Sequence, residues 1–340
     1  MTEGHLGSSC DQLGDLLSPV AGEMGKVEDL LEEWVREAPH SVSEPMSHTL
    51  GSGGKRLRPG LVLLAAHLGL GERILEEAPW LAAVAEVIHT ASLIHDDVVD
   101  EAPLRRGNPT VGKKWNPHRA LLVGDYWYSG MMKLLVELSD TWQGAVSACG
   151  EIAQAVCEMC DAEAKQQERE GPMMEEEDYL SLAGGKTGSL MATCCKLGGC
   201  CWNASEEDRE ALGQYGRCLG IAFQIADDLL DIRADQEMTG KTQGLDLLRS
   251  SPSLPLMWAR KLAEGKDREF LEALWGKEEA SDGDVHRIRC IVEDCGAAQA
   301  AREAAERQGE KARSSLDRWP ESPFRFSLTG LTNYAISRGR

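Results

Sequence analysis

Two acidic runs of the same form are the residues best suited to chemistry in this sequence. They occupy residues 96–100 and 227–231, each reads D-D-x-x-D, and each follows an apolar stretch. At 3.6 residues per helical turn, the first and last aspartates of a run share one face. Carboxylates on an apolar helix are costly unless something neutralises them. Because Mg²⁺ commonly bridges carboxylates to substrate phosphates, the runs predict a magnesium site.

A single run of this form is also typical of a solvated helix end. Its repetition in two apolar settings favours two metal sites that face each other around one ligand. The predicted metal ligands are Asp96, Asp97, Asp100, Asp227, Asp228 and Asp231.

A basic turn at residues 51–59 could hold the phosphate groups that such metals bridge. It reads G-S-G-G-K-R-L-R-P. Its glycines allow the backbone to approach a ligand closely, and its Lys and Arg side chains suit phosphate oxygens. Alone, the turn is typical of a solvated loop, but beside the acidic runs it becomes a candidate diphosphate pocket. Arg105 and Arg106 follow the first run and form a second candidate.

The sequence contains neither a G-x-S-x-G nucleophile motif nor a Walker loop. If the protein is an enzyme, metals and basic residues would therefore bind a diphosphate leaving group. Its departure would leave a cation in an apolar pocket, and catalysis would be mainly electrostatic and positional.

Composition narrows the class of protein further. The 340 residues carry a net charge of −20, which argues against non-specific nucleic-acid binding. No apolar run reaches the length of a membrane span. Eleven cysteines, an odd number in a large chain, favour a reducing compartment, so we expect a cytoplasmic protein. The C-x-x-C at Cys157 and Cys160 leaves a zinc site open, although thiols acting as small apolar residues fit better.

Helical periodicity dominates the chain. Residues 1–22 are expected to be a loose leader, and residues 23–340 to form a single all-α domain, a large helical bundle whose ligand site lies between facing helices. The predicted helices span residues 27–35, 61–68, 75–94, 119–138, 142–168, 179–197, 206–230, 254–263 and 285–312.

These motifs together resemble those of trans-type isoprenyl diphosphate synthases in the polyprenyl synthetase family, in particular its medium- and long-chain members. The resemblance extends over roughly residues 25–340 and implies the isoprenoid synthase fold with a central cavity. The matching segments occur in family order: 53–59, 89–101, 105–107, 124–125, 186–187, 223–231, 240–241, 244, 246–247 and 254–256.

The resemblance implies an enzyme that condenses isopentenyl diphosphate head-to-tail with an allylic diphosphate. Two or three Mg²⁺ ions would bridge the allylic diphosphate to the aspartates, with Asp228 and Asp231 supporting the second cluster. Three basic residues are implied to contact the allylic diphosphate: Arg105, Lys186 and Lys241. Four residues are implied to hold isopentenyl diphosphate: Lys55, Arg56, His89 and Arg106. Thr187 and Gln224 are implied to lie near the carbocation and the departing proton.

The sequence departs from the family pattern in two places. The second lysine usual before the Leu-Pro pair is replaced by Ser251 or its neighbour. Since Lys241 remains, we expect weaker closure over the diphosphate and not loss of activity. The usual Glu-Gly-Glu reads Asp161-Ala162-Glu163.

Product length depends on the residues below the first run. Ser92, Ala91 and Ile88 lie four, five and eight positions before Asp96, on the face below the reacting centre. In the family a large aromatic near Ala91 acts as a floor. The small residues here predict a product longer than farnesyl diphosphate, with Ile88, Met131 or Leu135 as lower obstructions.

Three other functions remain as alternatives. The chain could be a geranylgeranyl or farnesyl diphosphate synthase, or a non-catalytic subunit of a heteromeric synthase. A class I terpene cyclase fits poorly, because cyclases lack the second aspartate run and the basic turn. The resemblance also implies a homodimer, with transient membrane contact when a long product is released.

Overall fold

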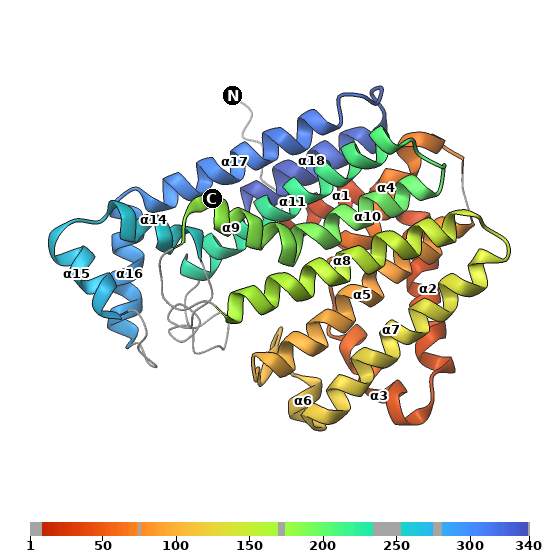
Figure 1. Ribbon diagram of the computed structural model, residues 1–340, viewed down its shortest axis with the longest axis horizontal. Coiled ribbons are helices and arrows are strands. Elements are labelled where there is room, and N and C mark those ends of the chain that lie inside the picture. The colour runs from red at the N-terminus through yellow and green to blue at the C-terminus, as the bar shows by residue number, and fades with distance from the viewer. Residues whose placement is uncertain (1–8, 74–75, 169–173, 234–252, 275–280, 339–340) are drawn as a thin grey trace. The chain divides into compact units, whose positions relative to one another are not determined.

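The computed structural model describes residues 9–73, 76–168, 174–233, 253–274 and 281–338, and helices dominate these ranges (Figure 1). As far as residue 139 the helices are α1 (Ser9–Leu17), η1 (Ser18–Val20), α2 (Ala21–Glu37), α3 (His40–Gly51), α4 (Leu57–Leu70), α5 (Glu77–Val99), α6 (Val111–Lys114) and α7 (Pro117–Ser139). Beyond it come α8 (Gly144–Gln167), α9 (Glu176–Ala183), η2 (Gly184–Gly188), α10 (Ser189–Cys200), α11 (Glu206–Arg233), α14 (Leu254–Leu262), α15 (Gly265–Leu274), α16 (Asp282–Asp294), α17 (Ala297–Ser315) and α18 (Pro323–Ser337).

The predicted all-α class is confirmed. The only strands in the described ranges are β1 (Leu104–Arg105) and β2 (Asn108–Pro109), which pair antiparallel. The described helices divide into two compact units. Unit 1 comprises Met1–Gln154, Leu190–Gly213 and Arg318–Leu328, and unit 2 comprises Ala155–Ser189, Gln214–Asp317 and Thr329–Arg340. Because each unit draws on distant segments, no single cut in the chain separates them.

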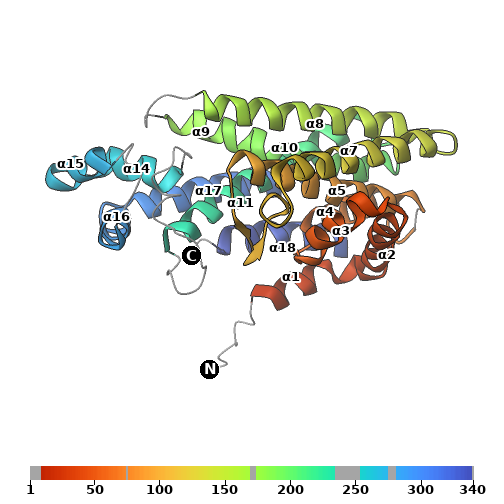
Figure 2. The same cartoon turned by 90° about the horizontal axis from the view of Figure 1, so that it is seen from below.

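Unit 1 is built around α4 and α5. Nearly every residue of α4 from Leu57 to His67 is buried, as is most of α5. These two helices pack on each other, and α5 also packs on α2 and α7 (Figure 2). Helix α10 approaches α4 backbone to backbone at Gly198, where an added Cβ would lie 2.5 Å from the carbonyl oxygen of Val62. This all-round burial explains why α5 reads as a continuous apolar stretch.

Unit 2 buries a second apolar core formed by α9, α11 and α14–α17. Helix α14 packs on both α16 and α17, which follow it in the chain (Figure 1). The sequence predicts one helix over residues 285–312, but the structure has two. Gly296 lies between them with φ +82°, a left-handed conformation that favours glycine and ends α16.

A π-helical turn, η2, interrupts the single helix predicted over residues 179–197. Helix α11 approaches this turn through glycines, since a Cβ on Gly220 would lie 2.6 Å from the Cα of Gly188. Larger side chains at either position would push the two backbones apart. The glycines thus hold Lys186 and Thr187, which lie in the turn, beside α11.

The predicted loose leader differs from the structure over its described part. Residues 9–20 form α1 and η1, Leu13 and Val20 are buried, and α2 begins before residue 23. The side chain of Leu17 lies over Gly60 of α4, where an added Cβ would meet it at 2.5 Å. The apolar side chains of this short segment dock on α4, a contact that composition alone does not reveal.

Besides α1, the helices α3, α6, α15 and α18 are absent from the sequence prediction. Pro45 lies inside α3, and prolines disfavour helix interiors, which obscured that helix. Of the described helices, none combines the length and apolar character needed to cross a bilayer.

A buried histidine ties α2 to α4 in unit 1. The Nε2 atom of His67 lies 2.8 Å from a carboxylate oxygen of Glu23, and Nδ1 lies 2.5 Å from the carbonyl oxygen of Gly71. The ring stacks on Phe324 with centroids 4.5 Å apart. Both neighbours are acceptors, so the geometry fits a ring that carries a proton on each nitrogen. Burial lowers the pKa of His67, but bonding to Glu23 and Gly71 raises it above its ordinary value overall.

We predict that His67 makes the stability of the protein depend on pH. Since its folded pKa is raised, the stabilisation is present below the unfolded pKa of 6.5 and is lost as pH rises through the folded pKa. His67→Gln should lower the free energy of unfolding at pH 6 by about 1–3 kcal/mol, and by less at pH 9. Denaturant unfolding at both pH values measures this. Exposed His118→Gln is the control, and a His67→Gln deficit that does not change with pH would contradict the prediction.

Candidate functional site

In each acidic run the second aspartate is buried and the other two aspartates are not. Asp97 and Asp228 are both 8% exposed, whereas Asp96 and Asp227 are half-buried. The last aspartates, Asp100 and Asp231, are exposed. The expected shared face of the first and last carboxylates is therefore open to a ligand. Helix α5 extends to Val99, into the first run and past its predicted end at residue 94, and α11 continues past the second run to Arg233.

Asp97 fixes the arginine of the β1–β2 hairpin. Its Oδ1 accepts a hydrogen bond from Nε of Arg105 at 2.7 Å, within unit 1. The hairpin follows α5 after a sharp break, since Glu101 adopts a left-handed φ of +51°. Arg105 is consequently held directly beside the first run.

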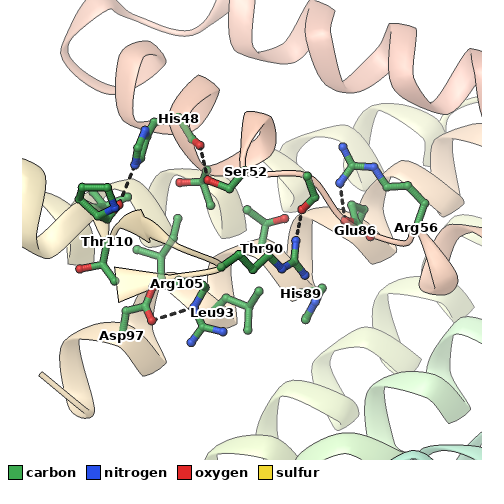
Figure 3. Close-up of a pocket in the computed structure, with 16 residues that line it drawn as sticks. His48, Ser52, Arg56, Glu86, His89, Thr90, Leu93, Asp97, Arg105 and Thr110 are labelled. Atoms are coloured by element: carbon green, nitrogen blue, oxygen red, sulfur yellow. Dashed lines mark hydrogen bonds and ion pairs between the residues drawn. The ribbon is translucent and has the colours of Figure 1, made fainter. Parts of the chain in front are cut away.

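A pocket in unit 1 gathers most of the basic residues predicted to bind diphosphate (Figure 3). One face of α5 supplies Glu86, Thr90, Leu93 and Asp97, spaced for helical neighbours. The basic side chains in its lining are those of His48, Arg56, His89, Arg105 and Arg106. Lys55 lies beside Arg56 in the basic turn of residues 51–59, but it is exposed and does not line the pocket.

Two carboxylates that the sequence analysis missed hold Arg56. Its Nε and Nη2 donate to Glu28 at 2.6 and 3.1 Å, and Nη1 donates to Glu86 at 2.7 Å. Glu86 is 5% exposed, so it is a buried charge with an arginine partner. A lone carboxylate in the apolar α5 stretch was the one available signal for this role. These bonds therefore fix the orientation of the Arg56 side chain and partly neutralise its positive charge.

The basic turn of residues 51–59 and the β1–β2 hairpin each contribute to the pocket a residue with a strained backbone. Arg56 and Arg106 both have left-handed φ angles, of +48° and +50°. Side chains other than glycine, asparagine and aspartate rarely adopt this conformation. Nη1 of Arg106 donates to the carbonyl oxygen of Gly53, which links the hairpin to the glycine-rich turn. Strained residues of this kind persist where the surroundings impose them, often at ligand sites.

His89 is held neutral in this basic environment. Burial first, and then the charges of Arg58, Arg106 and Arg105, lower its pKa well below the ordinary value. A neutral imidazole keeps one N–H donor, which can bond a phosphate oxygen, and adds no further positive charge.

In unit 2, hydrogen-bond acceptors also hold the side chain of Lys186, the lysine of the π turn. Nζ of Lys186 lies 2.7 Å from Oε2 of Glu163 and 3.2 Å from Oε1 of Gln166, both on α8. Glu163 belongs to the segment where the sequence departs from the family pattern. These contacts orient the ammonium group before any ligand arrives.

Thr187, Gln224 and Asp228 form one hydrogen-bonded chain. Oγ1 of Thr187 donates to Oε1 of Gln224 at 2.8 Å, and Nε2 of Gln224 donates to Oδ1 of Asp228 at 3.0 Å. Oδ2 of Asp228 accepts from the Tyr179 hydroxyl at 2.7 Å and from the backbone N–H of Leu254 at 3.1 Å. Burial raises the pKa of Asp228 to about 7, although these donors oppose the rise. Burial also raises the pKa of Tyr179 well above its ordinary value, so its hydroxyl remains a donor.

Asp227, on the open side of the second run, pairs with Arg338. Nη2 of Arg338 lies 3.1 Å from Oδ1 of Asp227, and the guanidinium carbon lies 4.4 Å from the centroid of the Phe223 ring. The sequence analysis gave Arg338 no specific role, because its partner lies far away in the chain.

The predicted product-length residues are buried on a different face of α5 from the pocket. Ile88 and Ala91 are inaccessible to solvent, and Ser92 is 9% exposed. Met131 and Leu135 of α7, the predicted lower obstructions, are also buried, and α7 packs on α5. One helix thus carries the pocket residues and the product-length residues on separate faces.

The structure leaves some predicted roles untested. Lys241 and Ser251 lie outside the described residues. The first run belongs to unit 1 and the second to unit 2, so their joint use around one ligand stays a prediction. Within the described ranges, no three histidine, cysteine or acidic side chains form a preassembled metal site. Metal ligation by the aspartates also stays a prediction.

Comparison with known proteins agrees with the motifs. A family model described as polyprenyl synthetase matches residues 39–292. The all-trans-nonaprenyl-diphosphate synthase (geranyl-diphosphate specific) of Rhodobacter capsulatus is 35% identical, over 95% of this chain and 97% of its own. The octaprenyl diphosphate synthase of Escherichia coli (strain K12) is 31% identical, over 94% and 97%.

Solved structures give the same result. The polyprenyl synthase of Caulobacter crescentus CB15, complexed with calcium and isoprenyl diphosphate, superposes with a TM-score of 0.86 at 31% identity, covering 96% of this chain and 97% of that one. The family match spans most of the chain, and the two relatives named above are more than 30% identical to it over nearly its whole length. The chain therefore belongs to the polyprenyl synthetase family, as its sequence motifs predict.

Proposed function

We propose that this protein is a trans-polyprenyl diphosphate synthase, which joins isopentenyl diphosphate head-to-tail (1′–4) to an allylic diphosphate. The observation that carries the proposal is the pocket of unit 1, where Arg56, His89, Arg105 and Arg106 line a cavity together with Asp97, the buried member of the first acidic run. Such a cluster of donors suits a diphosphate. The relatives named above support the reaction type.

Different residues of the pocket bind the two diphosphate substrates. Arg106 and neutral His89 offer N–H donors to isopentenyl diphosphate, and Arg56 is aimed by Glu28 and Glu86. Arg105, fixed by Asp97, contacts the allylic diphosphate. In unit 2, Lys186 binds the same diphosphate, and Thr187 and Gln224 lie near the carbon that becomes positive. The polar groups are oriented before the reaction, which lowers the cost of reorganisation.

The open carboxylates fit Mg²⁺. Asp96 and Asp100 are one turn apart on α5, and Asp227 and Asp231 repeat this arrangement on α11. Oxygen ligands of this kind, completed by phosphate oxygens, are typical of magnesium sites. When bound, the ions would neutralise the charge of the leaving diphosphate. Asp97 and Asp228, both buried and bonded to protein donors, would support these ligands from behind.

The protein should work in the cytoplasm. All ten cysteines with described side chains are free thiols, which suits a reducing compartment. Transient contact of the enzyme with a membrane when a long product is released remains part of the proposal.

The purified protein, incubated with labelled isopentenyl diphosphate and one primer at a time, should form long products only when Mg²⁺ or Mn²⁺ is present. Asp96→Ala or Asp227→Ala should lower kcat by at least about 10²-fold, since each removes a ligand from the charged leaving group. Asp140→Ala, an exposed carboxylate at the end of α7, is the control. Full turnover in excess chelator, or inactivity with every primer, would contradict the proposal.

Ala91→Phe should shift the products of the enzyme to shorter chains, because the ring would restore a floor below Asp96. Ala91 is fully buried, so overpacking should also lower stability by about 1–3 kcal/mol. Ala82→Phe is the matched control, since Ala82 is equally buried on the opposite face of α5. Products are resolved by chain length. An unchanged product distribution in Ala91→Phe, or an equal shift in Ala82→Phe, would refute the proposed role of Ala91 in setting product length.

We further propose a homodimer built on α7. Its exposed residues Leu122, Asp125, Ser129, Met132 and Val136 follow the alternating three- and four-residue spacing of a helix-packing seam. Leu122 and Val136 are 64% and 66% exposed, unusual for large apolar side chains. A second copy would cover this stripe.

Val136→Glu should convert the dimer to a monomer, because a charge would be buried at the seam. Light scattering at assay concentration measures the mass. Phe326→Glu replaces an equally exposed apolar residue of α18 and should leave the dimer intact. A monomeric wild type would exclude the proposed interface.

A further inference from the structure

Asp228 has the contacts of a structural anchor and not those of an open metal ligand. It is 8% exposed, and both of its oxygens accept hydrogen bonds from protein donors of three segments: Tyr179 on α9, Gln224 on α11 and the backbone of Leu254 on α14. Its neighbour Asp227, by contrast, has a side chain 35% exposed. These donors occupy three of the roughly four lone-pair sites of Asp228, and burial restricts access to the one that remains.

Asp228 determines which groups donate and which accept in the hydrogen-bonded series of Thr187, Gln224 and Asp228. Both oxygens of Asp228 accept hydrogen bonds, and Gln224 accordingly turns its Nε2 toward Oδ1. Its Oε1 then faces Thr187, and the Thr187 hydroxyl becomes the donor of that bond. The remaining lone pairs of Oγ1 and Oε1 are left as acceptors, which favour a nearby positive charge. If the amide of Gln224 turned over, its N–H groups would face Thr187 and the sign of this local field would reverse.

We propose that Asp228, held by Tyr179, is a positioning residue that sets the orientation of the Gln224 amide and the Thr187 hydroxyl, and does not bind metal. The inference rests on the proposed prenyl transfer, in which Thr187 and Gln224 lie beside the developing cation. Tyr179 is a new functional residue in this scheme. It acts through Asp228 without touching substrate.

The first test separates positioning from metal binding. Asp228→Asn should lower kcat by about 10–100-fold, as is typical for residues that orient others. The KM values and the Mg²⁺ concentration for half-maximal rate should stay within about twofold of wild type. Binding of Mn²⁺ in the presence of inorganic pyrophosphate, followed by electron paramagnetic resonance, should also be unchanged. A clear loss of Mn²⁺ affinity would show that Asp228 is a ligand and would overturn the inference.

The second test restores the order of bonds with a pair of substitutions. In Asp228→Asn the amide nitrogen can replace Oδ1, and the remaining oxygen can still accept from Tyr179 and Leu254. Adding Gln224→Glu supplies an acceptor for that nitrogen and keeps an oxygen toward Thr187. The double variant should recover at least about tenfold in kcat over Asp228→Asn alone. A double variant no better than the worse single one would contradict the proposed order.

Tyr179→Phe removes only the hydroxyl donor and should lower kcat by about 3–10-fold without changing either KM. Tyr215→Phe, a buried tyrosine of the same unit, is the control and should leave both unchanged. Equal losses in the two variants would indicate a general packing effect and would argue against a positioning role for Tyr179.

A hydrogen-exchange measurement without substrate tests the inference separately from the proposed function. In protein labelled with ¹⁵N-glutamine, the side-chain N–H signal of Gln224 should be protected from hydrogen exchange in wild type and lose protection in Asp228→Asn. If wild type makes no prenyl product but this pattern holds, the proposed function fails and the positioning contact stands. If Gln224 is equally protected in both proteins, Asp228 does not orient it.

Discussion

Two adjacent aspartates on a helix cannot face the same way, and much of this structure depends on that constraint. Successive side chains are turned by about 100°, so a run whose first and last carboxylates face outward turns the second one inward. An inward carboxylate in an apolar core requires donors. In unit 1 the donor is Arg105, and in unit 2 the donors are Tyr179, Gln224 and a backbone N–H. The buried member of each run thereby connects the exposed pair to the side chains around it.

The structure also arranges charge before a ligand binds. Arg56 is balanced by Glu28 and Glu86, and Lys186 by Glu163. These pairs hold the cations in fixed places without leaving them wholly unneutralised. An anionic ligand would then meet oriented donors, and part of their attraction would be offset by the carboxylates already present. His89 adds a donor to this set without adding charge, because burial first and then its basic neighbours lower its pKa.

The sequence predicts the parts of the site that depend on short spacing. The helix that leads into the first run and the shared face of Asp96 and Asp100 follow from local pattern alone. The partners of these residues do not. Arg56 meets a carboxylate 28 positions away, and Asp228 meets a tyrosine 49 positions away. Such contacts depend on how helices pack, which single-sequence periodicity does not encode. The π turn at Lys186 was also hidden, since its residues fit an unbroken helical pattern.

The two separate faces of α5 limit how this enzyme can change over evolution. The pocket residues Glu86 and Thr90 and the product-length residues Ile88 and Ala91 all precede the aspartates on one rigid helix. A one-residue insertion just before Asp96 would turn every earlier residue by about 100° relative to the aspartates and move both faces out of register with them. Under the proposed roles, diphosphate binding and product length would then change together. Substitutions along α5 would alter product length alone, whereas insertions and deletions just before Asp96 should be purged.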